Sequence, residues 1–454
     1  MDQITPPAAT ATAEHRDGAW PSPRVAWYAV FVFSLSLMVN FLDRGILTLL
    51  VEPLKRDLHL SDTQLSLVMG FAFVVFYAIL GLPIARMVDT RSRRVIIGIG
   101  LAIWALSTAA CGLATGFVAL FLFRIMVGVG EACTGPATFS MLADLFPPAK
   151  LPRAIAMLNF GFITGNGAAL LIGGAVIYAF TVHPTVDLPL FGPTAPWRLV
   201  FLAVGLPGLL VALLMATVPE PVRRGRLAGD QSGPLPLSKV VAFVVANRAV
   251  YAPLLGGLAL NTILSFGYGM WVPAFYMRTF GWTAGQVGLV SGLIYIIVWP
   301  LGAVFGSRLA EWLAARGRAD ANMRVVALAM ILTVPGSVIF PLLPSATIAV
   351  AVSAALGFVH AWVLGPQNAA IQIITPNEMR GQVTALFLFV FNVIGFGFGA
   401  TVVALLTDHV FGGESGLKLS LATAAATLGP LAALIIWRGL PAYGAAVTRA
   451  KTWE

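Results

Sequence analysis

Residues 81–94 read Gly-Leu-Pro-Ile-Ala-Arg-Met-Val-Asp-Thr-Arg-Ser-Arg-Arg, and they mark the point where an apolar segment gives way to a basic cluster. The apolar segment, near 65–88, is long enough to cross a bilayer, which takes roughly 20 apolar residues. Basic residues that follow such a segment directly are typical of a short loop held at the cytoplasmic surface of a membrane. The stretch therefore indicates a membrane protein.

The composition supports this interpretation. Of 454 residues, 58% are hydrophobic and 10% are charged, whereas a soluble domain carries about 25% charged residues. The net charge of +9 does not indicate a nucleic-acid partner, because the basic residues lie between apolar segments rather than in one patch. Cys111 and Cys133 both fall in apolar stretches and belong to no metal-binding motif, so we expect neither a metal nor another cofactor.

Apolar segments of spanning length recur along the whole chain, and they predict an all-α membrane protein with twelve transmembrane helices. The predicted spans lie near 25–50, 65–88, 95–114, 117–144, 153–180, 197–218, 249–277, 284–309, 323–343, 346–371, 380–407 and 416–438.

The basic residues also predict the orientation of these spans. Most of the 28 Lys and Arg fall on the side of the two termini, while the opposite loops hold only Lys55, Arg56, Arg198, Arg278 and Lys418. Positive charge concentrates on the cytoplasmic side, so we expect both termini in the cytoplasm and the protein in the plasma (inner) membrane.

A long polar connection divides the chain into two sets of six spans. We predict a disordered cytoplasmic tail at 1–22, a first half at 23–218, a cytoplasmic linker at 219–248, a second half at 249–440 and a further tail at 441–454.

The two predicted halves carry matching features. Arg86 and Asp89 have counterparts 222 residues later in Arg308 and Glu311, and Gly135-Pro136 has one 230 residues later in Gly365-Pro366. Two such matches indicate a duplication, and two parallel halves are the organisation of major facilitator transporters. The fold would place its substrate site near the membrane midplane, between the halves.

The stretch quoted above resembles the signature loop of that family. The resemblance implies that it latches one conformation without touching substrate, and the residues concerned are Gly81, Asp89, Arg91, Arg93 and Arg94. The other interpretation of these residues is a simple positive-inside loop.

Charged residues inside predicted spans are costly and are by default hypotheses of function. Span 1 contains Asn40, Asp43 and Arg44, and span 4 contains Arg124 and Glu131. Arg124 and Glu131 share a face but lie roughly 10 Å apart along the helix, so we expect pairs between spans 1 and 4. Asp43 would meet Arg124 and Arg44 would meet Glu131, or the reverse. The cluster is either a structural ion network or a proton-coupling site, and we favour the second.

Motifs around these charges narrow the family. Asn40-Phe-Leu-Asp-Arg44, Leu60-Ser-Asp-Thr-Gln64, Phe71-Ala-Phe-Val-Val-Phe-Tyr77 and Phe123-Arg-Ile-Met-Val-Gly-Val-Gly-Glu-Ala132 together resemble the spinster-like branch, which transports lysolipids and sphingosine-1-phosphate. The resemblance is specific over 40–175 and generic elsewhere.

This resemblance implies a proton-coupled exporter of an amphiphilic or anionic small molecule, working by alternating access as a monomer. It implies proton coupling by Asp43 and Glu131, and a substrate and charge network of Arg44, Arg124 and Asn40. A guanidinium suits a phosphate-bearing head group. The rest of a possible cavity comprises Phe71, Tyr77, Tyr268, His360, Gln367 and Asn392.

Some features depart from the family pattern or leave alternatives open. Span 5 has Gly165-Asn-Gly167 before Gly173-Gly174 without the proline of the antiporter signature, so proton antiport has no motif behind it. A facilitator for a small organic anion, drug or sugar acid would share the fold and charges. A membrane enzyme or a receptor is disfavoured, because no catalytic motif, nucleotide-binding loop or partner domain is recognisable.

Overall fold

The structure is a computed structural model that describes residues 20–147, 150–181, 186–188, 192–223 and 236–450. The predicted tail therefore lies outside the described residues up to position 19, as do residues 224–235 of the linker and 451–454 of the second tail.

Six apolar spans form the first half of the molecule. Its helices are α1 (Pro23–Leu49), α2 (Val51–Leu58), α3 (Asp62–Ser66), η1 (Leu67–Phe71), α4 (Ala72–Thr90), α5 (Arg93–Cys111), α6 (Phe117–Ala132), α7 (Thr134–Leu145), α8 (Leu151–Thr181) and α9 (Pro196–Thr217). A short antiparallel hairpin, β1 (Val186–Leu188) and β2 (Gly192–Thr194), pairs Val186 with Thr194 between α8 and α9.

Six further spans form the second half. Its helices are α10 (Leu237–Ala246), α11 (Arg248–Phe280), α12 (Ala284–Leu293), η2 (Ile294–Val298), α13 (Trp299–Ala315), α14 (Ala321–Ile339), η3 (Phe340–Leu342), α15 (Ala346–His360), η4 (Ala361–Val363), α16 (Leu364–Ile373), α17 (Asn377–Val390), η5 (Phe391–Phe396), α18 (Gly397–Leu405), η6 (Leu406–Val410), η7 (Glu414–Gly416) and α19 (Leu417–Ala450).

The predicted twelve-span, all-helical architecture is confirmed. Eleven described helices are long and apolar enough to cross a membrane, and α8, with 31 residues, is the twelfth. Two details differ from the prediction. The linker region contains the helix α10, and α19 continues through Pro441 to Ala450 where a tail was expected, because its last turns pack beside α11. In those turns Tyr443 is 2% exposed, and Ala446 borders the same small space as Val250 and Tyr251 of α11.

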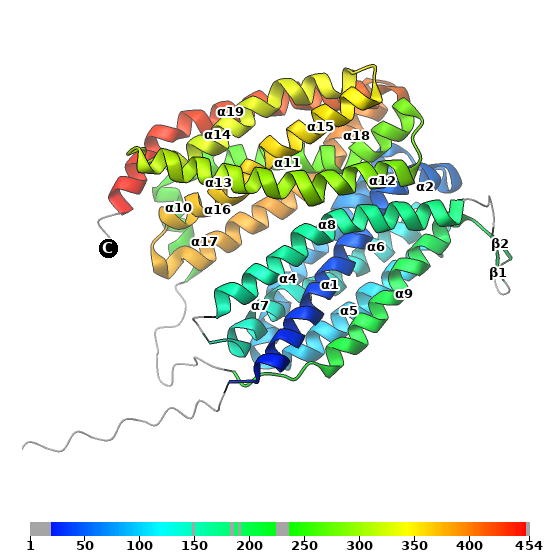
Figure 1. The fold of residues 1–454 in the computed structure, drawn as a ribbon, viewed down its shortest axis with the longest axis horizontal. Coiled ribbons are helices and arrows are strands. Elements are labelled where there is room, and N and C mark those ends of the chain that lie inside the picture. Colours follow the sequence, from blue (N-terminus) through cyan, green and yellow to red (C-terminus); the bar gives the residue numbers. More distant parts are fainter. Residues whose placement is uncertain (1–19, 148–149, 182–185, 189–191, 224–235, 451–454) are drawn as a thin grey trace, which may run out of the picture.

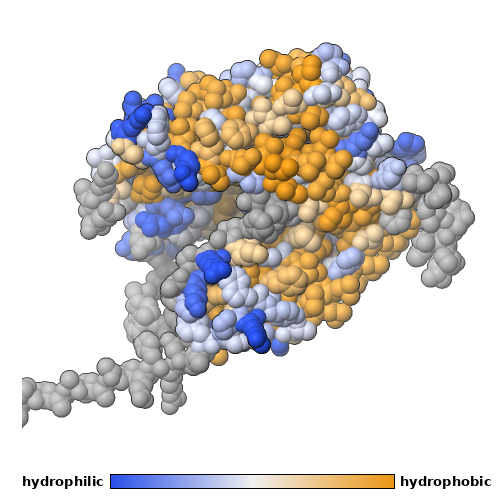
Figure 2. All heavy atoms as spheres, in the orientation of Figure 1, coloured by the Kyte–Doolittle hydropathy of each residue, from blue (hydrophilic) through white to orange (hydrophobic). Residues whose placement is uncertain are grey.

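The two halves lie side by side and spread apart towards one end (Figure 1). We call the end where α1 begins and α19 finishes the terminal end, and the end that carries α2 and the β-hairpin the hairpin end. Hydrophobic residues cover the middle of the visible face of both halves, and hydrophilic residues gather near its ends (Figure 2). This distribution fits a protein whose apolar middle section contacts lipid.

The second span of each half begins in the same way. Ser61 and Gln64 form a capping box at the start of α3, and Thr283 and Gln286 form one at the start of α12, 222 residues later. Each span then passes through a π-helical segment, η1 or η2. The duplication seen in the sequence therefore extends to helix capping and to local helix geometry.

Candidate functional site

The first ion pair of the predicted charge cluster is sealed inside the first half. Arg124 of α6 donates to Asp43 of α1 at 2.6 Å, and both side chains are 1% exposed. A buried pair of this kind is costly to break by removing one partner, because the other charge is left uncompensated.

The second pair lies beside it and is more accessible. Arg44 of α1 donates to Glu131 of α6, and the exposed fraction of the Arg44 side chain is 21%. The two pairs are the first of the two pairings that the helix geometry allows, with each acid on the opposite helix from its base.

Aromatic rings from both halves surround the Arg44 guanidinium. Its central carbon lies 4.4 Å from the ring centre of Phe73 in α4 and 5.1 Å from that of Phe396 in η5. Cations over ring faces are favoured electrostatically. Because Phe396 belongs to the second half, Arg44 contacts both halves at once.

Glycines allow the helices of this cluster to approach closely. A Cβ on Gly130 of α6 would lie 2.6 Å from the backbone nitrogen of Trp104 in α5, and one on Gly128 would overlap the backbone of Phe73. The Gly-Val-Gly-Glu segment therefore brings Glu131 against neighbouring helices that a larger residue would hold away.

Two of the six predicted cavity residues line a partly open cavity, bordered mainly by the second half. Tyr268 and His360 border a cavity of about 170 Å³ between α11, α12, α13, α14 and α15. The Tyr268 hydroxyl donates to the carbonyl of Ser337 at 2.5 Å, and His360 Nε2 lies 3.0 Å from Ser265 Oγ.

The other four lie elsewhere. Tyr77 stacks on Phe73 at 5.8 Å, and Phe71 packs edge-on against Phe398 of the other half. Gln367 and Asn392 do not border this cavity; the Asn392 amide donates to the carbonyl of its helix neighbour Leu388.

At the terminal end, part of the predicted latch forms an ion network with two acids. Arg93 donates to Asp144 of α7 and, at 2.8 Å, to Glu220 after α9. The backbone of Arg94 and the hydroxyl of Ser92 donate to Glu220 at 2.8 Å each. Burial tends to raise the pKa of Glu220, but these hydrogen bonds outweigh it and hold the pKa below its ordinary value.

The remaining latch residues have other surroundings. The Arg91 carbonyl accepts from Arg223 at 2.6 Å. Gly81 lies within α4 with open space where a side chain would be. Asp89 lies in α4, and its side chain is outside the described part of the structure.

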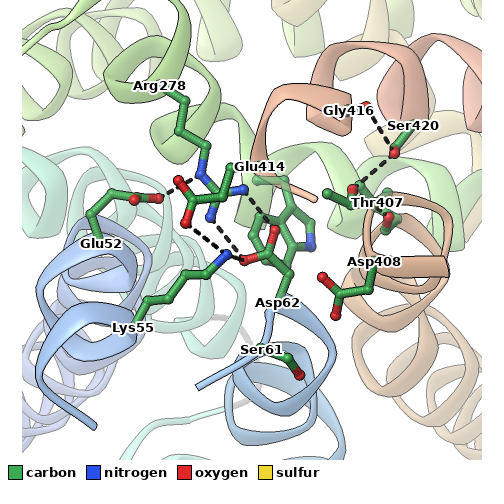
Figure 3. Close-up of polar contacts among 12 residues, drawn as sticks. Glu52, Lys55, Ser61, Asp62, Arg278, Thr407, Asp408, Glu414, Gly416 and Ser420 are labelled. Carbon is green, nitrogen blue, oxygen red and sulfur yellow. Dashed lines mark hydrogen bonds and ion pairs between the residues drawn. The ribbon is translucent and has the colours of Figure 1, made fainter. Parts of the chain in front are cut away.

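A second ion network, absent from the sequence predictions, joins the two halves at the hairpin end (Figure 3). Arg278 of α11 donates to both oxygens of Asp62, at 2.6 and 2.9 Å, and to Glu52 at 2.6 Å. Lys55 donates to Asp62 at 2.8 Å and lies 3.0 Å from Glu414. Asp62 thus receives cations from both halves.

Hydrogen bonds continue this junction. The backbone and hydroxyl of Thr63 in α3 both donate to Asp408 of η6 at 2.7 Å. Further along, Gly174 of α8 and Gly288 of α12 approach so closely that a Cβ on Gly288 would lie 2.9 Å from the Cα of Gly174. The halves are therefore locked together at the hairpin end.

Comparisons with known proteins agree with this architecture. Residues 33–400 match the model of the Major Facilitator Superfamily. An MFS-type efflux pump of Mycolicibacterium smegmatis is 30% identical over 412 residues, 90% of each chain. A hexuronate transporter of Bacillus subtilis is 25% identical over 61% of each chain.

Among solved structures, a bacterial homologue of the human lysosomal transporter Spinster, in an inward-facing and unoccupied conformation, superposes with a TM-score of 0.77. It is 25% identical, and the match covers 94% of this chain and 98% of that one. The predicted resemblance to the spinster-like branch is confirmed.

The chain belongs to the major facilitator superfamily. It is an integral membrane transporter with the family's two six-helix halves.

Proposed function

We propose that this protein is a secondary active transporter that alternates access between its halves and couples export of an anionic amphiphile to protons. The substrate would be a lysolipid or a sphingosine-phosphate-like molecule. The observation that carries the proposal is the accessible Arg44–Glu131 pair beside the sealed Asp43–Arg124 pair.

The difference in exposure separates the roles of the two pairs. An anion can reach the Arg44 side chain, which is 21% exposed, but not that of Arg124, which is 1% exposed. While Glu131 is ionised it occupies Arg44. A proton on Glu131 neutralises this competitor and frees Arg44 for an anionic head group. Anion and proton therefore bind to the same state and cross in the same direction, so an outward flux of the anion carries protons outward and responds to the proton gradient.

The cavity of the second half supports an amphiphile as the substrate. Apolar side chains such as Leu264, Ile294 and Leu356 line much of it. Leu170 of α8 also borders the cavity, and its Cδ2 lies 3.6 Å from the position of a Cβ on Gly45, next to Arg44. Leu170 thus connects the wall of the cavity to α1, the helix that carries Arg44.

The direction of opening is also part of the proposal. With both termini in the cytoplasm of a plasma-membrane protein, the hairpin end faces outward, and its ion network closes the outer side. The inward-facing Spinster homologue supports this orientation, and the mycobacterial efflux pump supports export. A monomer suffices, because one chain builds both the charge site and the cavity.

The test is flux of a fluorescent lysophospholipid in proteoliposomes, with and without a proton gradient. We expect gradient-dependent flux in the wild type and its loss in Glu131→Gln. Glu378→Gln, which neutralises an exposed acid in α17, is the matched control and should transport normally. Gradient-driven flux that survives in Glu131→Gln would overturn the coupling mechanism.

A small organic anion such as a sugar acid is the second candidate substrate. The similarity to the hexuronate transporter favours it, and Arg44 would bind a carboxylate equally well. Flux of a hexuronate without flux of lysolipid in the same vesicles would select this alternative.

A further inference from the structure

We propose that Asn40 holds ordered water between Glu131 and Asp43 and so relays protons from the accessible acid to the sealed one. The inference rests on the proposed proton coupling and adds a positioning residue to it.

The first observation is a set of unpartnered polar atoms on α1 and α6. Within the described part of the chain, both amide atoms of Asn40, Asp43 Oδ1 and Glu131 Oε2 are buried without a hydrogen-bond partner. Asn40 is only 2% exposed. Buried polar groups are nearly always satisfied, by protein or by ordered water. One water makes about three hydrogen bonds, so a short chain of waters held by Asn40 can satisfy this set across the roughly 10 Å of depth between the two acids.

The second observation is the depth of Asn40 in the first half. Asn40 precedes Asp43 by three residues and Arg44 by four, so it lies on their side of α1, about 5 Å nearer the terminal end. On the antiparallel α6, Glu131 lies seven residues, or roughly 10 Å, beyond Arg124 towards the same end. Because Arg124 is level with Asp43, Asn40 falls between the two acids in depth.

The surroundings suit water rather than apolar packing. The hydroxyls of Thr134, Thr138 and Ser36, and Trp104 Nε1, are likewise buried without a partner among the described residues. Ser36 lies four residues before Asn40, and Thr134 three after Glu131, so each continues the same helix face. The polar faces of α1 and of the span formed by α6 and α7 thus extend together.

The relay balances in protons. The Glu131 carboxylic acid gives its proton to the first bound water, protons pass along the chain of waters, and the last water gives one to Asp43 Oδ1. Glu131 becomes ionised and pairs with Arg44 again, while Arg124 faces a neutral acid. The charged and titratable groups that face the two acids are Arg44 of α1, Arg124 of α6, Tyr77 of α4 and Cys111 of α5.

The experiment measures how fast each carboxyl exchanges its proton. Purified protein at acid pH is mixed rapidly with D2O, and the carboxyl bands are followed by infrared spectroscopy. Asp43→Asn and Glu131→Gln assign the two bands. In Asn40→Leu we expect exchange at Asp43 to slow by about tenfold or more, with Glu131 unchanged. Asn40→Ser, whose hydroxyl binds water, should restore most of the rate.

The matched control is Gln367→Leu, which removes a buried amide, 6% exposed, from the second half outside the cavity. It should leave both exchange rates unchanged, and size-exclusion profiles check that every variant folds. Unchanged exchange at Asp43 in Asn40→Leu, or slowing of both acids alike, overturns the relay but not the proposed transport. Loss of gradient-driven lipid flux in the wild type, with the exchange results as expected, would instead overturn the proposed function alone.

Discussion

The Arg278 guanidinium donates to both carboxylate oxygens of Asp62, a residue 216 positions earlier in the chain and in the other half. Asp62 is fully buried at this contact. Two parallel hydrogen bonds between a fork-shaped cation and a carboxylate are among the stronger polar contacts in proteins. The pair therefore stabilises the arrangement in which the hairpin end is closed.

Neutralising Asp62 should open the hairpin end. Among the described residues, Asp62→Asn leaves Arg278 with Glu52 as its one charged partner. Loss of one member of a buried pair costs about 3 kcal/mol. We expect the ratio of closed to open molecules to fall by on the order of a hundredfold. Spin labels at His59 and Ser415, both exposed at this end, would report the change as a longer distance. Lys418→Gln, which removes an exposed charge nearby, should leave the distance unchanged, and an unchanged distance in Asp62→Asn would contradict the prediction.

A single methyl group between α8 and α12 should have a similar effect by steric means. In Gly288→Ala the new Cβ would meet the Cα of Gly174 at 2.9 Å, closer than real Cβ atoms approach. The closed arrangement is destabilised by about 1–3 kcal/mol, as for overpacking in general. The same spin-label pair measures the shift. Gly256→Ala in α11 is the control, because no atom lies within 4 Å of its added Cβ; opening by both variants would argue against a local steric cause.

Most of this fold was predictable from the sequence, for a physical reason. Lipid selects apolar helices of a set length, so each span is visible in its own residues. The pairing of Asp43 with Arg124 could also be predicted as one of two possibilities. Charges inside spans are few, and helix geometry leaves only two ways to pair them between spans 1 and 4. The choice between them depends on the rotation of α1 against α6, which no local pattern encodes.

The ion network at the hairpin end could not be predicted from the sequence, for a related reason. Its charges lie at the ends of spans, where charged residues are common and carry little information. Arg278 and Asp62 become neighbours only through the docking of one half on the other. The cavity of the second half is likewise a product of packing, so it contains Tyr268 and His360 but not Gln367 or Asn392.

The ion network at the terminal end predicts a pH dependence of stability. Glu220 has a folded-state pKa below its ordinary value of 4.5, so its contribution is complete above that value and is lost as the pH falls through the folded-state pKa. We expect Glu220→Gln to lower the thermal stability at pH 7 by at most about 1 kcal/mol, because the side chain is 27% exposed. The deficit should shrink as the pH falls below 4.5. Thermal unfolding of both proteins between pH 3 and 7 measures this, and a deficit that grows on acidification would contradict it.

The sealed pair predicts a non-additive response to mutation. Asp43→Asn leaves the Arg124 guanidinium uncompensated in an interior where its side chain is 1% exposed, and we expect a loss of about 3 kcal/mol in stability. Arg124→Gln should cost a similar amount, because it strands the carboxylate instead. The double variant Asp43→Asn/Arg124→Gln removes both charges and should recover most of the loss, since a neutral replacement of a buried pair is often tolerated. Thermal unfolding of the four proteins in detergent gives the coupling free energy.

If the two single losses of stability simply add in the double variant, Asp43 and Arg124 do not stabilise the protein as a pair. If stability recovers while gradient-driven flux stays absent, the pair is required for transport beyond its part in holding α1 against α6.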